Sequence, residues 1–91
     1  MFAHDLDIKR KIDEFDKLWA EAASEMSWCH GGSRPPDFAK VVRSCARAFE
    51  LYREIENYFR GKGLDVPETV RMKHEHLKTM HHFASRGRCG W

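Results

Sequence analysis

The chain has 91 residues, of which 42% are hydrophobic and 33% are charged, and its formal net charge is +2. This length allows one small domain with one core and leaves little room for a buried active site. No apolar run approaches the roughly 18 residues of a membrane-spanning helix. Asp5 and Asp7 lie where a secretory signal would need a basic segment followed by apolar residues. We therefore expect one soluble domain over residues 1–91, in the cytoplasm and without membrane contact.

Apolar residues recur at helical spacing in the first third of the chain. This periodicity predicts an amphipathic helix at about residues 6–28, with Asp5 or Asp7 as its cap. Residues 29–36 contain two glycines and two prolines and predict a loop. The first two helices would then be antiparallel neighbours. The apolar positions are Ile8, Ile12, Phe15, Trp19, Ala22 and Met26.

The central stretch carries the longest apolar stripe. It predicts a helix at about residues 36–60, the longest of three, whose apolar residues fall within an arc of roughly 140°. Ser33 or Asp37 can cap this helix, and Gly61 supplies the left-handed residue that ends it. The stripe consists of Phe38, Val41, Val42, Cys45, Ala48, Phe49, Tyr52, Ile55 and Phe59.

A third helix is expected at about residues 66–85, followed by a tail at 86–91. Asp65 and Glu68 have the spacing of a capping box. Lys73 falls inside the apolar stripe, so its side chain must reach either solvent or an acid of the first helix. The sequence thus predicts an all-α fold, an antiparallel up-down-up bundle of three helices with the second helix in the centre. The inward-facing residues of the third helix are Val66, Val70, Leu77, Met80 and Ala84.

Cysteines and histidines raise the question of a metal site. Three cysteines are an odd number without a zinc or redox spacing, which predicts reduced thiols rather than disulfides. His74, His76, His81 and His82 contain no pair three or four residues apart, so no helix face presents two imidazoles to one ion, and the first three are expected to border the core. We expect no metal and no cofactor. One arrangement stays open, because the topology brings Cys29, His30, His82 and Cys89 to the same pole of the bundle.

Basic side chains gather at that pole and near the start of the second helix, where the positive end of the helix dipole already favours an anion. Glu21 and Glu25 of the first helix would lie alongside and could neutralise part of this charge. A net charge of +2 is low for a domain that binds the phosphates of a nucleic acid. Nucleic-acid binding is therefore the alternative function, with Trp28 or Trp91 stacking on a base. The basic residues are Arg34, Lys40, Arg43, Arg47, Arg86 and Arg88.

Large apolar side chains outside the predicted stripes favour a protein interface. Leu51 and Tyr58 would lie on the outer face of the second helix beside Arg47, and Trp28 and Trp91 lie off any helical stripe. Aromatic residues mixed with arginine are typical of protein interfaces. A surface that binds another protein is therefore the first hypothesis.

The sequence contains no catalytic motif. The segment Cys29-His30-Gly31-Gly32-Ser33 has neither a nucleophile elbow nor a phosphate-binding pattern, so we expect no enzymatic activity. The most plausible function is that of a small inhibitor or adaptor that occupies a surface of a larger protein, as small proteins of phages and mobile elements do. The identity of the partner and the oligomeric state stay open. The predicted partner-binding residues are Trp28, Arg34, Lys40, Arg43, Arg47, Leu51, Tyr58, Arg86, Arg88 and Trp91.

Overall fold

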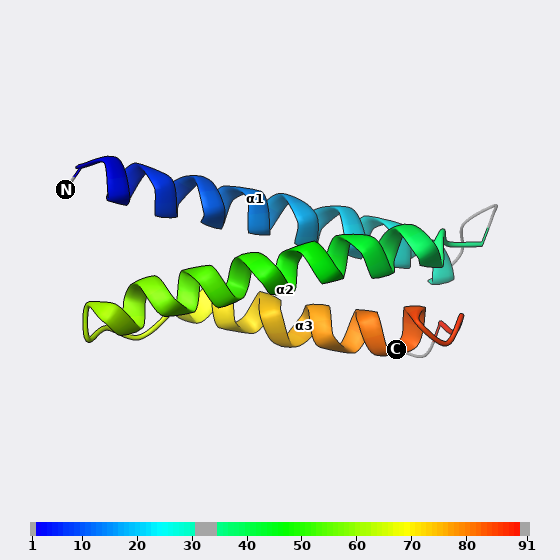
Figure 1. Cartoon of the computed structure of the whole chain (residues 1–91). Coiled ribbons are helices and arrows are strands. Elements are labelled where there is room, and N and C mark those ends of the chain that lie inside the picture. Colours follow the sequence, from blue (N-terminus) through cyan, green and yellow to red (C-terminus); the bar gives the residue numbers. More distant parts are fainter. Residues whose placement is uncertain (1, 31–34, 90–91) are drawn as a thin grey trace.

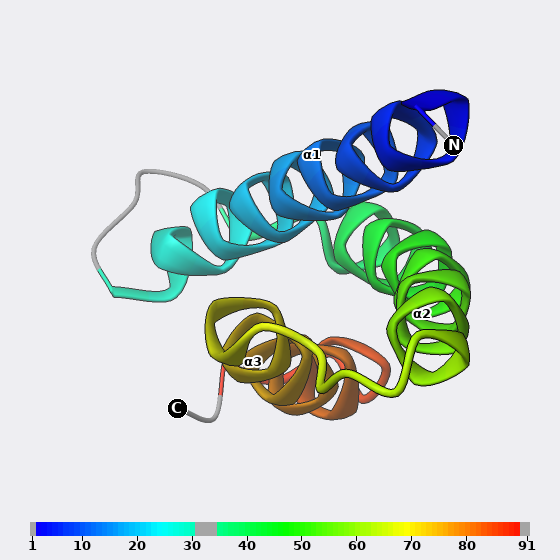
Figure 2. The same ribbon diagram turned by 90° about the vertical axis from the view of Figure 1, so that its left-hand side faces the viewer.

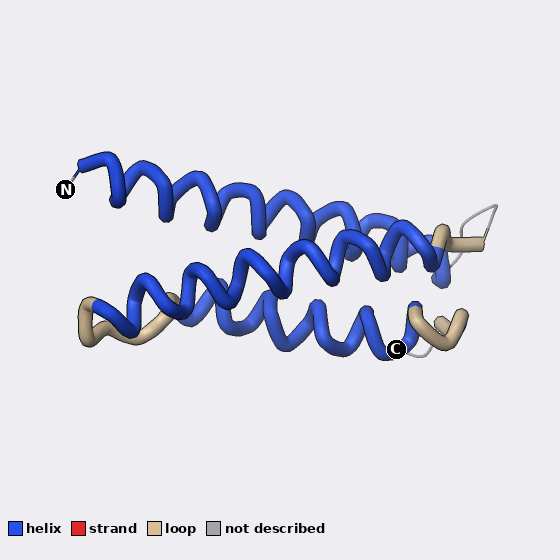
Figure 3. The backbone as a smooth tube through the Cα atoms, in the orientation of Figure 1, coloured by secondary structure: helices blue, strands red, loops and turns tan. Residues whose placement is uncertain are grey.

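The computed structural model describes residues 2–30 and 35–89, which form three α-helices and one short 3₁₀ helix (Figure 1). In chain order these are α1 (Phe2–Met26), η1 (Ser27–His30), α2 (Phe38–Gly61) and α3 (Glu68–Ala84). Figure 3 shows helices and loops throughout the described backbone, and the predicted all-α fold is confirmed. The helices lie along the long axis of a body of 48 × 19 × 17 Å, and α2 runs opposite to α1 and α3.

Two predictions about the length of the helices need correction. The first helix begins at Phe2, before the predicted start at about residue 6. The central helix is not the longest, since α1 has 25 residues and α2 has 24. It is nevertheless the central helix, because α2 packs more extensively against α1 and α3 than these two helices pack against each other (Figure 2).

The start of α2 is fixed by two carboxylates. Asp37 is the cap, and its side chain accepts a hydrogen bond from the backbone N–H of Lys40 at 3.1 Å. The N–H of Asp37 in turn donates to the Glu25 carboxylate at 2.7 Å, which ties the end of α1 to the start of α2. Ser33, the other predicted cap, lies outside the described residues.

The end of α2 and the start of α3 differ from the prediction. Gly63, with a φ of 69°, is the left-handed residue rather than Gly61, and the N–H of Leu64 donates to the carbonyl of Phe59 at 2.9 Å. No capping box forms at Asp65, because the N-cap of α3 is Pro67, which makes no side-chain cap hydrogen bond. The residue before a proline avoids the helical conformation, so α3 cannot begin at residue 66.

The core lies between the three helices and includes one residue that the sequence placed outside. Leu51 is only 1% exposed, so its predicted place on the outer face is wrong. At 100° per residue the buried positions of α2 cover an arc of roughly 120°, which is no wider than the predicted stripe but is rotated towards Leu51. Phe49 and Tyr52, at the middle of the predicted stripe, are only partly buried. None of the described helices is long and apolar enough to span a membrane. The fully buried large side chains are Phe15, Met26, Leu51, Ile55, Leu77, Met80, Val41 and Cys45.

A disulfide joins Cys29, in η1, to Cys89, in the segment that follows α3, and the prediction of reduced thiols is wrong for these two residues. They are 60 residues apart in sequence, yet their Cα atoms lie 5.5 Å apart, because α1 and α3 end at the same pole (Figure 1). The spacing of cysteines along the sequence does not indicate a disulfide between residues so far apart. Cys45 is a free thiol in the core.

Candidate functional site

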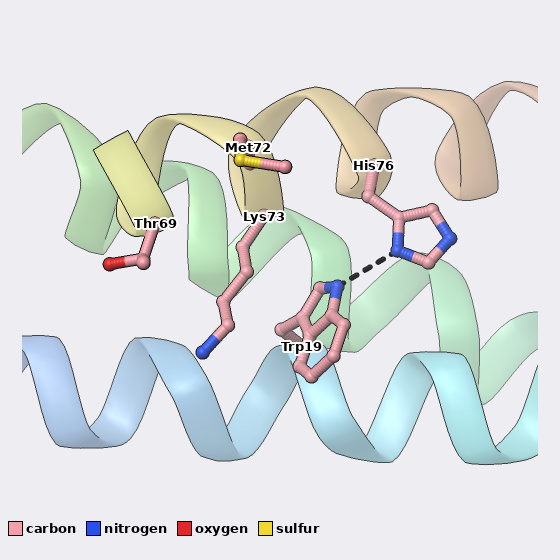
Figure 4. Close-up of a pocket in the computed structure, with 5 residues that line it drawn as sticks. All are labelled: Trp19, Thr69, Met72, Lys73 and His76. Carbon is pink, nitrogen blue, oxygen red and sulfur yellow. Dashed lines mark hydrogen bonds between the residues drawn. The ribbon is translucent and has the colours of Figure 1, made fainter. Parts of the chain in front are cut away.

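A groove of about 370 Å³ lies between α1 and α3 (Figure 4). Trp19 reaches it from α1, and the other lining residues, Thr69, Met72, Lys73 and His76, come from α3. On a helix, residues separated by three, four and seven positions lie on one face, so these four side chains form a continuous wall. The groove therefore follows the line along which α1 and α3 approach each other.

Polar contacts along the groove tie α1 to α3. The indole N–H of Trp19 donates to Nδ1 of His76 at 2.9 Å. The ammonium of Lys73 lies 3.0 Å from the carboxylate of Asp16 and 4.9 Å from the centroid of the Trp19 ring. Of the two alternatives expected for Lys73, solvent or an acid of the first helix, the structure shows the second. These contacts hold the aromatic ring of Trp19 in place in the groove.

The hydrogen bond defines the protonation state of His76. Because the indole can only donate, Nδ1 of His76 must carry a lone pair, and the proton of the neutral ring lies on Nε2. Burial lowers the pKa of His76, which favours the same neutral form. Figure 4 shows that the second ring nitrogen points away from Trp19.

Met72 gives the groove an apolar edge. Its side chain is 63% exposed, the largest fraction among the exposed large hydrophobic residues of the described chain. A flexible thioether adapts to different apolar partners, whereas the neighbouring indole is rigid. Lys73 is engaged with Asp16, and Nδ1 of His76 accepts from Trp19, so neither is arranged as a nucleophile or a base. The groove is suited to receiving an apolar side chain.

The structure does not bring the predicted residues of the outer face of α2 together as a binding patch. Leu51 is in the core, and Tyr58 is half-buried, with its ring edge-on to Phe59 at 5.3 Å. The guanidinium of Arg47 lies 3.2 Å from a carboxylate oxygen of Glu14 on α1 and 3.2 Å from one of Glu50. Arg47 therefore helps to hold α2 against α1.

The start of α2 and the segment after α3, which carry the described basic residues of the predicted pole, lie at the same end of the bundle (Figure 1). Trp28 lies in η1 and is 36% exposed. Glu25 is buried, and its carboxylate accepts the Asp37 N–H, which places a negative charge at the start of α2. No acid in residues 2–30 or 35–89 forms an ion pair with the exposed basic residues of this pole. Arg34 and Trp91 lie outside the described residues. The described basic residues are Lys40, Arg43, Arg86 and Arg88.

The four-residue metal arrangement at this pole is not formed in the oxidised protein. The sulfurs of Cys29 and Cys89 are bonded to each other, so neither is a thiolate ligand. The His82 ring is exposed and lies edge-on to Phe83 at 5.2 Å, whereas the side chain of His30 is outside the described part. Within that part, no group of three His, Cys, Asp or Glu residues is placed to hold a metal. His74, His76 and His81 are half-buried beside the core as expected, and the ring of His74 stacks on Tyr52 at 3.7 Å.

The groove was not predicted as a site, although its signal is present in the sequence. Thr69, Met72 and His76 form an uncharged stripe on the flank of α3, beside the positions that face the core. Trp19 has the periodicity of a core residue, and its partial exposure depends on the neighbouring helix. The fold and the groove together define a three-helix bundle with a surface cleft along one helix pair. Comparison with protein families, curated proteins and solved structures found no match.

Proposed function

We propose that this chain is a small non-enzymatic binding protein whose groove between α1 and α3 receives an amphipathic helix of a larger protein. The observation that carries the proposal is that Trp19 and the exposed Met72 both line that groove. The helices α1 and α3 run in the same direction, and α2 covers them from the other side (Figure 2). A further helix in the groove would complete a four-helix arrangement, which is a common packing solution.

The lining residues indicate what the partner helix presents. Trp19 and Met72 would contact large apolar side chains spaced three, four and seven residues apart, as in other helix-in-groove complexes. The ion pair of Lys73 with Asp16 lies beside them and suits a polar residue at the edge of that stripe. An inhibitor or adaptor acts in this way, by occupying a surface, and the cytoplasmic location expected from the sequence is part of the proposal.

The test uses a charged substitution in the groove. Protein captured from a lysate with the wild-type chain should not be captured by Met72→Glu, because a carboxylate buried against Trp19 loses its hydration. Leu6→Glu is the matched control, since Leu6 is also highly exposed, at 58%, and does not line the groove. Nuclease treatment should leave the capture unchanged. Equal capture by Met72→Glu and Leu6→Glu would show that the groove is not the binding surface.

A second candidate function rests on the basic pole. Lys40, Arg43, Arg86 and Arg88 are exposed and have no acidic partner in the described chain, so they are available to phosphates. The measurement is the affinity for a fluorescent single-stranded oligonucleotide at increasing salt. Phosphate contacts predict a log-log slope of about −0.7 per neutralised phosphate, whereas an apolar groove responds weakly to salt. Loss of binding when all four residues become glutamine, with Met72→Glu unaffected, would favour this function.

A further inference from the structure

We infer that the disulfide between Cys29 and Cys89 is a site of reversible thiol–disulfide exchange, in which an anionic thiol attacks Cys89 and Cys29 is the leaving thiol. The inference does not depend on the proposed binding function. It rests on the unequal exposure of the two cysteine residues, on the charge around them and on the burial of the third cysteine.

The two cysteines differ in accessibility. Cys29 is half-buried and packs against the core, whereas Cys89 is exposed in the tail after α3. Exchange requires a thiolate to approach one sulfur along the axis of the disulfide, so access decides which sulfur is attacked. Because Cys89 is the more exposed residue, its sulfur is the one that an incoming thiolate reaches more easily.

Charge favours the same sulfur. Arg88 directly precedes Cys89, and Arg86 lies two residues earlier, both exposed and without an acidic partner in residues 2–30 and 35–89. Positive charge at this end of the disulfide attracts an anionic reagent towards Cys89. In the reduced protein the same charge stabilises the Cys89 thiolate, which then is the better nucleophile towards a small disulfide. Lys40 and Arg43 lie at the same pole and extend this field. The expected reagent class is therefore a small thiol with net negative charge, of which glutathione is an example.

Cys45 does not compete in this chemistry. It is 0% exposed, and its Sγ–H donates to the carbonyl of Leu77 at 3.6 Å. Burial raises the pKa of its thiol to about 11, so the reactive thiolate is scarce at neutral pH. Exchange is thus confined to Cys29 and Cys89. Cys45 cannot form a disulfide with either of them while the protein is folded.

The reaction is a two-electron exchange between sulfurs. A thiolate attacks Sγ of Cys89, the bond between the two cysteines breaks, and Cys29 leaves as a thiolate that takes a proton from water. A second small thiol then attacks the mixed disulfide, which releases reduced Cys89 and the oxidised small disulfide. The protein disulfide is reduced and two small thiols are oxidised. Since the core lies between the helices, exchange frees the tail without removing the packing of α1, α2 and α3.

The test compares two single variants under native conditions with glutathione disulfide as the probe. Cys29→Ser retains Cys89, and Cys89→Ser retains Cys29. We expect Cys29→Ser to form the glutathione adduct at least about tenfold faster, as followed by intact mass, because access and thiolate character both favour Cys89. In the Cys29→Ser background, Arg86→Gln with Arg88→Gln should slow the adduct several-fold, and circular dichroism should be unchanged.

A second measurement avoids these cysteine substitutions. The oxidised wild-type chain, treated with substoichiometric reduced glutathione and quenched with acid, should carry the mixed disulfide at Cys89 when its peptides are mapped. Adducts divided equally between Cys29 and Cys89, or found at Cys45, would overturn the inference. The inference would also be overturned if protein purified without reductant contained three free thiols, because no disulfide would then be present.

Discussion

At the scale of single residues, the hydrogen bond between Trp19 and His76 makes stability depend on pH. Protonation of Nδ1 removes the acceptor and places a positive charge in the groove with Lys73, whose charge is offset by Asp16. Burial lowers the pKa of His76 below its ordinary value of 6.5, so the unfolded chain binds the proton more readily than the folded one. The stabilisation is complete above pH 6.5 and is lost as the pH falls through 6.5 towards the lower pKa of the folded state.

His76→Gln separates this effect from the packing of the ring. The amide oxygen of glutamine can accept the indole hydrogen bond but does not titrate in this range. Thermal unfolding of the wild type should show a midpoint that falls between pH 7 and pH 5, and the fall should be shallower in His76→Gln. A residual slope is expected from His74. Its pKa is lowered by burial and by the positive charge of Lys78, whereas Glu75 and Glu56 act in the opposite direction. Identical slopes in the two proteins would contradict the role of His76.

At the scale of the helices, the sequence could predict which segments are helical but not how far each face is buried. Three apolar stripes and two breaker segments predict three helices, and the structure confirms them. Leu51 was misplaced because the orientation of α2 depends on two neighbouring helices, which periodicity within α2 cannot show. The start of α3 could have been found from Val66-Pro67, since the conformational restriction before a proline is local. The end of α2 was ambiguous, because Gly61 and Gly63 both suit a helix terminus.

These two glycines give a matched pair of substitutions. Gly63 has a φ of 69°, so Gly63→Ala should destabilise the protein by about 1–2 kcal/mol, because a Cβ is disfavoured in this conformation. Gly61 is the last helical residue, and a Cβ there would have no atom within 4 Å. Gly61→Ala should therefore be neutral, or stabilising by up to about 1 kcal/mol, because alanine is the better helix former. Urea unfolding of both variants is the measurement, and the reverse order of stabilities would show that Gly61 carries the left-handed turn.

At the scale of the whole molecule, topology decides which distant residues meet. The up-down-up order places residues 29 and 89 at one pole, and the sequence predicted that proximity. The sequence did not predict the bond, because three cysteines are an odd number and their spacing matches no known disulfide or metal motif, which favoured free thiols. The groove between α1 and α3 was beyond prediction for a related reason. Its width depends on how closely two helices that are not adjacent in sequence approach each other.

The disulfide should contribute to stability through this same topology. It links two residues 60 positions apart, and closing a loop of that length in the unfolded chain is worth about 4 kcal/mol in the chain-entropy model. Wild-type protein should therefore unfold at lower urea concentration when a reductant is present. The double variant Cys29→Ser with Cys89→Ser should match the reduced wild type and should not respond to the reductant. Far-ultraviolet circular dichroism should be the same for all folded samples, because the bond lies outside the helix-to-helix core. Equal urea midpoints for oxidised and reduced wild type would mean that the bond does not restrict the unfolded chain, and that the packing of α2 against α1 and α3 alone sets the stability.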